Sequence, residues 1–567
     1  MAHLRTTPLL VLASVLASSP ARAQAAAPAA SSNPPSPGAE APPGPAPPTV
    51  APSGGQAPVT PPVTPPVTPP VTPPVTPPVT PPVTPPVTPP VTSPAASPAA
   101  KPAPVSAGAP MTEVPPIPLE QREQAPAVES WFYRPPLAVA IGEGDRRWSV
   151  TLYGFVEADA INDSTRSYVD SIGGSLVARD ELFEGRNGRT QFSIRNTRLG
   201  FALRSPAIGG VRPSAIVETD FFGNQPSKPP STSEAAYFDS PGLRLRQAYL
   251  KLEDDVVDVW AGQTYYLFGW QNYFFPCSLE FLGLPNQAFG RTTQVRLGHT
   301  FASREIDLDV AVAALRPAQR DSEIPDANAG IRLSVNRWKG ISTPGNGGTA
   351  AFPLAVGVSG AVRSFKVDAF EPPPTTRSNH ATGWGVSVDA LVPVIPAADA
   401  NDRGNRLTLT GSFVVGTGIA DLVTAGGGAS FPTLPNPAMA SQPPLYTPNI
   451  DNGLVTFDNA GVLHTIDWMT YMVGVQYYVP PTGRVILAAN YTESFSDNMA
   501  ALYPKGGAEI LLLTRVARRT RYADANVFFD VTPAVRLGAS FQYTSTEYVD
   551  GATPRNLRWM AQALYFF

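Results

Sequence analysis

The stretch that most constrains the fold of this chain is its last one, residues 556–567. Every second residue from Leu557 to Phe567 is apolar, whereas the intervening positions include Asn556 and Arg558. Such alternation is typical of a β-strand with one apolar face and one wetter face. A terminal apolar strand fits a closed barrel, because its last strand must pair with its first or leave an edge open. The alternative is an ordinary edge strand of a soluble β-domain.

The same period-two alternation recurs from residue 149 onward. In residues 211–222, for example, Val217 and Phe221 oppose Glu218 and Asp220. A segment of roughly ten residues crosses a bilayer when it is tilted. We count about 16 such segments, an even number as in bacterial barrels. They span residues 149–162, 190–204, 211–222, 243–254, 256–268, 291–301, 305–315, 328–339, 353–366, 381–392, 405–417, 466–479, 484–494, 519–531, 534–546 and 556–567.

The links between these segments fall into two classes. Several are short: residues 253–255, 302–304, 480–483 and 532–533. Most of the others are long: residues 163–189, 223–242, 269–290, 316–327, 367–380, 418–465 and 495–518. Short turns at one rim and long loops at the other are typical of outer-membrane barrels. The sequence therefore predicts an all-β, transmembrane antiparallel barrel of about 16 strands.

The N-terminal part has a different composition. Residues 1–23 read as a signal peptide, with a basic start, an apolar core and a small-residue cleavage site. Residues 24–145 form a Pro/Ala-rich segment with PPVT repeats over residues 61–92, and such repeats favour solvated polyproline II. We expect a disordered periplasmic spacer, either passive or in contact with the cell wall. Residues 146–567 would form the barrel.

Catalytic and metal-binding patterns are missing from the sequence. His3 lies in the signal peptide, and His299, His380 and His464 are isolated, without the spacing of known catalytic or zinc motifs. Cys277 is the single cysteine, which excludes an intramolecular disulfide and makes a cysteine-based metal site implausible. The net charge of −4 gives no reason to expect nucleic-acid binding. We predict no enzyme activity, no cofactor and no metal.

The polar face of the predicted strands carries many charges, and a charge facing inward needs water or a partner. This load predicts a water-filled lumen. Two interpretations stay open: the charges neutralise one another as cross-strand pairs, or some arginines face the solute unpaired and attract anions. The candidate pore-lining residues are Arg198, Arg244, Arg246, Arg296, Arg332, Glu157, Asp159, Glu218 and Asp220.

The third long link, residues 269–290, is too apolar to extend into solvent. We expect it to fold into the barrel and narrow the pore. The alternative is packing on another loop or on a neighbouring subunit. The candidate constriction residues are Tyr273, Phe274, Phe275, Glu280 and Phe281.

Four short stretches resemble the trimeric porins of Gram-negative outer membranes, most closely the DcaP-like group. They are LYGFVEADA at 152–160, RNTRLGF at 195–201, LRLRQAY at 243–249 and AGQT at 261–264. The terminal Phe567 also resembles the C-terminal signal of bacterial outer-membrane proteins. The resemblance covers residues 149–567, and phosphate-selective and general porins carry similar pieces. DcaP-like chains often carry an N-terminal coiled coil, where this chain has PPVT repeats.

The resemblance implies a trimer of 16-stranded barrels whose third loop constricts the pore, with uptake of small, often anionic solutes. We therefore expect an outer-membrane porin for passive diffusion of small hydrophilic solutes, with a slight preference for carboxylate-type anions. Its partners would be two further copies of the chain, outer-membrane lipid and the solutes. The alternative is an outer-membrane structural anchor without a channel, or a surface β-protein tethered by the Pro-rich spacer.

Overall fold

The computed structural model describes residues 137–143, 146–173, 176–223, 241–271, 273–281, 283–345, 347–368, 377–399, 401–424, 449–458, 462–502 and 516–567. The signal peptide and the PPVT repeats predicted from the sequence lie outside the described residues. Among the described residues, no helix is both long and apolar enough to cross a membrane.

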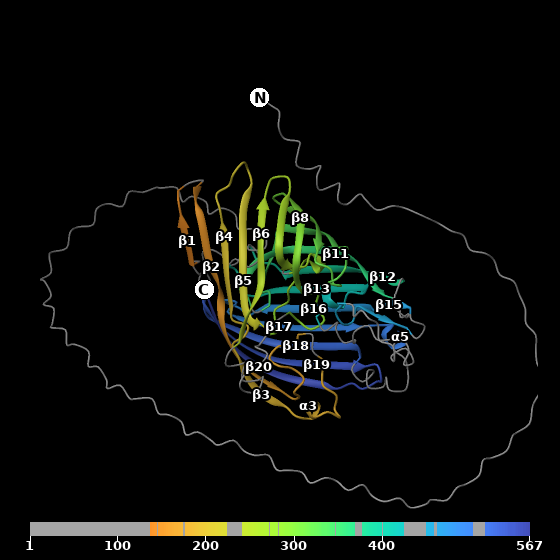
Figure 1. The fold of residues 1–567 in the computed structure, drawn as a ribbon. Coiled ribbons are helices and arrows are strands. Elements are labelled where there is room, and N and C mark those ends of the chain that lie inside the picture. The colour runs from red at the N-terminus through yellow and green to blue at the C-terminus, as the bar shows by residue number, and fades with distance from the viewer. Residues whose placement is uncertain are drawn as a thin grey trace, which may run out of the picture. The chain divides into compact units, whose positions relative to one another are not determined.

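The described chain forms a closed antiparallel barrel of 16 strands, in which β3 and β4 together make one strand of the wall (Figure 1). Every segment predicted from the sequence corresponds to one position in this wall. The strands are β2 (Trp148–Asp163), β3 (Arg189–Ser193), β4 (Arg198–Arg204), β5 (Arg212–Gly223), β6 (Gly242–Glu253), β7 (Asp258–Tyr265), β8 (Arg291–Ala302), β9 (Ile306–Leu315), β10 (Asp326–Ser342), β11 (Ala350–Asp368), β12 (Ser378–Ile395), β13 (Arg406–Thr417), β16 (Asp467–Tyr478), β17 (Val485–Phe495), β18 (Ala517–Thr532), β19 (Val535–Tyr548) and β20 (Arg555–Phe566).

The last strand pairs with the first, as the alternation in residues 556–567 predicts. β20 runs antiparallel to β2, with Tyr565 opposite Val156 and Ala561 opposite Ala160. In Figure 1 the two strands lie side by side, although they are at opposite ends of the colour scale. The pairing of β20 with β2 from Phe155 to Asp163 is the seam that closes the wall into a barrel.

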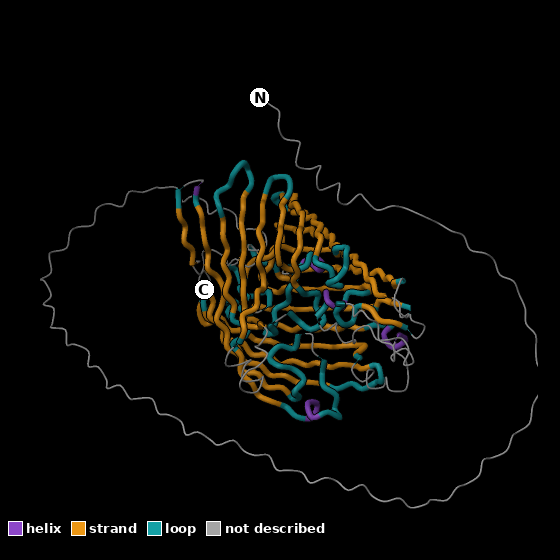
Figure 2. Tube along the Cα trace, viewed as in Figure 1, coloured by secondary structure: helices purple, strands orange, loops and turns teal. Residues whose placement is uncertain are grey.

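Successive links alternate between the two rims because consecutive strands are antiparallel. The short ones include residues 254–257, 303–305 and 533–534, all at the rim where β20 ends. The long links after β7 and after β13 leave the wall at the opposite rim. The longest links thus lie at one rim, as predicted, although the link 396–405 at the other rim is longer than the link 549–554 at this one. Figure 2 shows teal loop segments among the orange strands.

The two faces of the wall differ in chemistry. In β20, Leu557 and Trp559 are exposed on the outside, whereas Asn556, Arg558 and Gln562 are buried on the inside. The other strands repeat this division, which suits a barrel that has hydrocarbon outside and a polar interior.

Two glycines of the resembling stretches have steric roles. A Cβ atom on Gly200 would lie 2.3 Å from the ring of its cross-strand partner Tyr153. Gly154 has a φ of +151°, and its Cβ would meet the carbonyl oxygen of Arg198 at 2.1 Å. Glycine at both positions therefore lets β2 and β4 approach closely beneath the Tyr153 ring.

The sequence did not predict three short strands. β1 (Leu137–Ile141) lies within the segment assigned to the spacer and pairs with Trp148–Leu152 of β2. β14 (Val455–Phe457) and β15 (Leu463–Thr465) form a hairpin in the long link after β13. Short helical turns are limited to α3 (Phe183–Arg186), η2 (Phe268–Trp270), η3 (Ala420–Leu422) and α5 (Met499–Leu502) within the described ranges.

Candidate functional site

The long link 266–290, which we call the lumen loop, crosses the interior of the barrel. It leaves the wall at β7 and reaches inward-facing residues of β17 and β18 on the other side. Ser278 donates to Asp524 at 2.7 Å, and Asn490 donates to the carbonyl oxygen of Cys277 at 2.7 Å. Thr492 donates to the Pro285 carbonyl at 2.7 Å. These bonds hold the loop against the inner wall.

The aromatic residues of the lumen loop pack in separate places. Tyr273 and Phe274 join a buried cluster with Phe352 of β11 and Leu391 of β12. Phe275 meets the rings of Tyr265 and Phe289 edge-on, within the region near β7 and β8. Together with Phe281, these residues are at most 9% exposed. The loop that carries these residues is turned inward, as its apolar sequence indicates. Their role in constricting the pore stays a prediction.

Phe281 and Glu280 reach a different part of the wall. Phe281 packs with Ile161 and Met560 in a cluster with other inward-facing residues. Glu280 accepts a hydrogen bond from Ser171 at 2.7 Å and one from the backbone of Ile172 at 3.0 Å. Burial raises the pKa of the Glu280 carboxyl above its ordinary value, against the opposing effect of a nearby arginine.

That arginine is Arg558 of β20, which the sequence analysis missed. Its guanidinium donates to both carboxylate oxygens of Asp163, at 2.8 and 2.9 Å, and one nitrogen lies 3.7 Å from Glu280. It also donates to the carbonyl oxygen of Asp170. Arg558 is fully buried. Its contacts connect β20 with β2 at the seam, with Asp170 in the first long link and with Glu280 in the lumen loop. The only indication of Arg558 in the sequence is its position on the polar face of the last strand.

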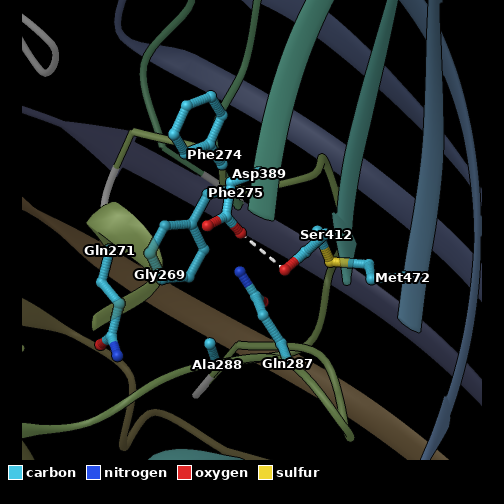
Figure 3. Close-up of a pocket in the computed structure, with 9 residues that line it drawn as sticks. All are labelled: Gly269, Gln271, Phe274, Phe275, Gln287, Ala288, Asp389, Ser412 and Met472. Atoms are coloured by element: carbon cyan, nitrogen blue, oxygen red, sulfur yellow. Dashed lines mark hydrogen bonds between the residues drawn. The ribbon is translucent and has the colours of Figure 1, made fainter. Parts of the chain in front are cut away.

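A second loop, residues 418–424 at the start of the long link after β13, also folds inward. Thr424 exchanges backbone hydrogen bonds with the lumen loop: its N–H donates to Gln287 at 2.9 Å, and its carbonyl accepts from Asn286 at 2.9 Å. Its hydroxyl also accepts from the Gln287 backbone at 3.0 Å. Figure 3 shows the side chain of Gln287, in the lumen loop, facing Asp389 and Ser412, which belong to the wall strands β12 and β13. The sequence did not predict this contact between loops.

The inner wall from β4 to β8 concentrates arginines. Arg246 donates to Glu218 at 2.7 Å and to Asp220 at 2.8 Å. Arg244 pairs with Asp220 at 2.6 Å, and Arg198 lies 3.9 Å from Glu218. The side chains of Arg244 and Arg198 are 29% and 19% exposed, whereas Arg246 is 1% exposed. The structure therefore brings these five predicted residues into one network.

The other predicted residues lie elsewhere on the inner face. Arg332 donates to Asp309 of the neighbouring β9 at 2.9 Å, and Arg296 donates to the Tyr265 carbonyl at 2.6 Å. Glu157 and Asp159 lie next to the seam, on β2. Cross-strand pairing, one of the two interpretations of the charges, thus describes several of them. Whether any of them lines the path of a solute stays a prediction.

The histidines of the barrel do not gather at one site. His299 lies against the ring of Phe301, His380 is 3.0 Å from the Ser378 hydroxyl, and His464 is 2.9 Å from Asp458. In the part of the chain that the structure describes, no three His, Cys, Asp or Glu side chains form a metal-binding group. The absence of enzyme activity stays an expectation.

Comparison with solved structures shows which known fold this is. The chain superposes on the outer membrane channel DcaP of Acinetobacter baumannii with a TM-score of 0.50 and 18% identity, over 76% of this chain and 100% of that one. The chain has the fold of this channel. An anion-selective porin from Comamonas acidovorans (TM-score 0.42, 10% identity, 74% and 100% covered) and Pseudomonas putida OprB (0.40, 14%, 73% and 94%) are also similar. No family model and no curated protein matches the chain.

Proposed function

We propose that this chain is an outer-membrane porin that forms a water-filled channel for the passive diffusion of small hydrophilic solutes. One observation carries the proposal: a closed 16-stranded wall is apolar outside and charged inside. Barrels of this strand number are wide enough to leave an aqueous channel. The likeness to the DcaP outer membrane channel supports the same function and a location in the outer membrane. We propose in addition that the N-terminal spacer lies in the periplasm and that the chain assembles as a homotrimer, as the porin-like stretches of the sequence imply.

The inward position of the lumen loop favours a narrow pore beside the arginines of the inner wall from β4 to β8. The loop is held against β11, β12, β17 and β18, and we propose that the solute passes between it and the inner wall from β4 to β8. There, among the described residues, Arg198, Arg246 and Arg291 act on Glu218, and Arg244 and Arg246 act on Asp220, so four arginines share two acids. An excess of arginine at a narrow place favours anions, because guanidinium stays charged and binds carboxylates through two hydrogen bonds. We therefore propose small carboxylate-type anions as preferred solutes.

Planar-bilayer recording of the purified full-length protein tests the channel. Stepwise conductance is expected, in groups of three if the protein is a trimer. Unheated and boiled samples should migrate differently on a gel, as expected of a folded barrel, and this confirms that the protein used is folded. A silent bilayer with folded protein would contradict the channel and favour a structural anchor.

Anion preference is tested by the reversal potential across a salt gradient. Arg244→Ala removes the most exposed cation of the network and should weaken the preference, and adding Arg246→Ala should weaken it further. Arg212→Ala is the matched control, because Arg212 lies at the rim with its side chain 49% exposed. Cation preference in the native pore, or equal potentials in all variants, would refute the proposed selectivity.

Deletion of residues 273–284 tests the constriction. The deletion removes the part of the lumen loop that crosses the barrel, so single-channel conductance should rise. An unchanged conductance in a folded variant would place the narrowest point elsewhere.

A further inference from the structure

The outer face of β18 carries arginines near the rim of the long links. Arg519 and Arg521 alternate along the strand with Thr520 and Tyr522, whose side chains are buried inside the barrel. There Thr520 donates a hydrogen bond to Asn286 of the lumen loop, and Tyr522 packs in a buried cluster with the same loop. Because side chains alternate across a strand, the two arginines face outward, on the side of the lipid.

A β-bulge adds a third arginine to this face. β18 shifts its register against β19 between Ala517 and Arg519, so Arg518 is the extra residue. The Nε of Arg518 donates to Glu547 of β19 at 2.8 Å, and the Nε of Arg519 lies 3.7 Å from the same carboxylate. A bulge lets two consecutive residues oppose one partner, so Arg518 joins Arg519 on the outer face.

The neighbouring acid on β17 is partly occupied by tyrosines. Glu493 lies opposite Arg521, and its Oε2 accepts hydrogen bonds from the hydroxyls of Tyr471 and Tyr491, at 2.5 and 2.8 Å. Its Oε1 lies 3.2 Å from the guanidinium of Arg519 and 3.3 Å from that of Arg521. Glu493 therefore offers these two arginines one shared oxygen instead of a bidentate pair.

The arginines of this cluster outnumber the acids that they contact. Among the described residues, Arg518, Arg519 and Arg521 form their ion pairs with Glu493 and Glu547 only. The three arginine side chains are 44%, 36% and 32% exposed. A guanidinium carries more N–H donors than these contacts use, so donors and a positive charge are left for a ligand outside the barrel.

The depth of the cluster in the membrane follows from the aromatic residues beside it. Two residues after Arg521, Ala523 lies between Tyr491 of β17 and Tyr543 of β19. Trp559 of β20 is 61% exposed on the same outer face. Outward-facing aromatic rings mark the boundary between hydrocarbon and headgroups, and the long links of such a barrel are extracellular. The arginines lie on the long-link side of these rings, so they face the headgroups of the outer leaflet.

We propose that Arg518, Arg519 and Arg521, which we call the rim arginines, bind the phosphate groups of lipopolysaccharide, the phosphorylated glycolipid of the outer leaflet. Guanidinium binds phosphate through two parallel hydrogen bonds, and clusters of basic side chains at a membrane surface attract anionic headgroups. The rings of Tyr471 and Tyr491, 6.0 Å apart, give the lipid an apolar surface beside the arginines. This site rests on the proposed location in the outer membrane and does not depend on conduction.

Native mass spectrometry of the purified full-length protein, delipidated in detergent and titrated with diphosphoryl lipid A, tests the site. Saturable binding is expected. Replacement of all three rim arginines (Arg518→Gln, Arg519→Gln and Arg521→Gln) should weaken it about tenfold or more. The single-channel conductance of this triple variant should stay unchanged, because the rim arginines lie outside the lumen. Failure of the lipid site and failure of the channel are therefore separate results.

The matched control removes three exposed cations at the opposite rim, by Arg304→Gln, Arg337→Gln and Lys339→Gln. It changes the net charge equally and should bind lipid A as the native protein does.

A second variant, Glu493→Gln with Glu547→Gln, frees the rim arginines from their acids and should strengthen binding of lipid A. It also decides the matter if the triple arginine variant does not fold. The proposal is overturned if the native protein shows no saturable binding, or if a folded triple variant binds as tightly as the native protein. Equal loss in the control variant would also overturn it, because any cation of the barrel would then serve. So would unchanged binding without the two glutamates, because the arginines would then serve only their pairs.

Discussion

Replacement of Arg558 by methionine should destabilise the barrel strongly. The guanidinium is fully buried and is bound through two nitrogens to Asp163, with Glu280 at 3.7 Å. Methionine keeps much of the side-chain volume and removes the charge, so two carboxylates would remain buried without their cation. Breaking a buried pair in this way costs about 3–5 kcal/mol.

The lower end of that range applies here, because both acids keep other donors. Asn556 still donates to Asp163 at 2.8 Å, and Ser171 still donates to Glu280 at 2.7 Å. We therefore expect a loss of about 3 kcal/mol in the free energy of unfolding, or roughly a hundredfold in the folding equilibrium.

The assay is reversible unfolding by guanidinium chloride of protein folded into lipid vesicles, followed by tryptophan fluorescence. Arg555→Met is the control, because Arg555 is exposed at the start of the same strand and its loss should change stability by less than about 0.5 kcal/mol. Asp163→Asn combined with Arg558→Met should recover part of the loss. An Arg558→Met barrel as stable as the Arg555→Met control would refute the reasoning.

Three further predictions follow from the loops and the seam. Because burial raises the pKa of Glu280, the contribution of this carboxyl to stability is fully present below about pH 4.3, the ordinary pKa of Glu, and is lost as pH rises through its folded-state pKa. Glu280→Gln should remove this contribution to the pH dependence of the unfolding midpoint. Gly200→Val forces a side chain into the ring of Tyr153 and should cost about 1–3 kcal/mol, part of which Tyr153→Ala should recover. Thr424→Val removes the hydroxyl that binds the lumen loop and should speed hydrogen exchange at Gln287 in a barrel that still migrates as folded.

The positions of the strands could be predicted because the environment of the wall repeats every two residues. In β9, Ile306, Leu308 and Val312 face outward and Asp309 faces inward, as their alternation in the sequence indicates. An outer surface in contact with hydrocarbon cannot tolerate the reverse arrangement, so the pattern survives along each strand. Pairing in order around the wall then follows from the short links.

Contacts made by the loops could not be predicted in the same way. Glu280 and Arg558 lie far apart in the sequence, and nothing in the alternation of β20 indicates which loop residue its inward side chains meet. The turn at residues 194–197 was also hidden, because it interrupts a segment that reads as one strand. These contacts depend on the height of each side chain along the barrel, which register and loop conformation determine together.

β1 takes part in closing the barrel. β20 pairs with β2 only from Phe155 onward, so the N-terminal part of β2 would have an unpaired edge on that side. β1 pairs with this part, and its Leu137 and Ile141 stand opposite Leu152 and Trp148. Unpaired strand edges invite aggregation, and the five-residue β1 covers this edge of β2 and leaves only its own short edge. The sequence hid β1 because all five of its residues are apolar and follow a proline-rich stretch, which left no alternation to read. The seam is therefore closed by a strand from each side of the barrel domain, and the terminal strand alone does not complete it.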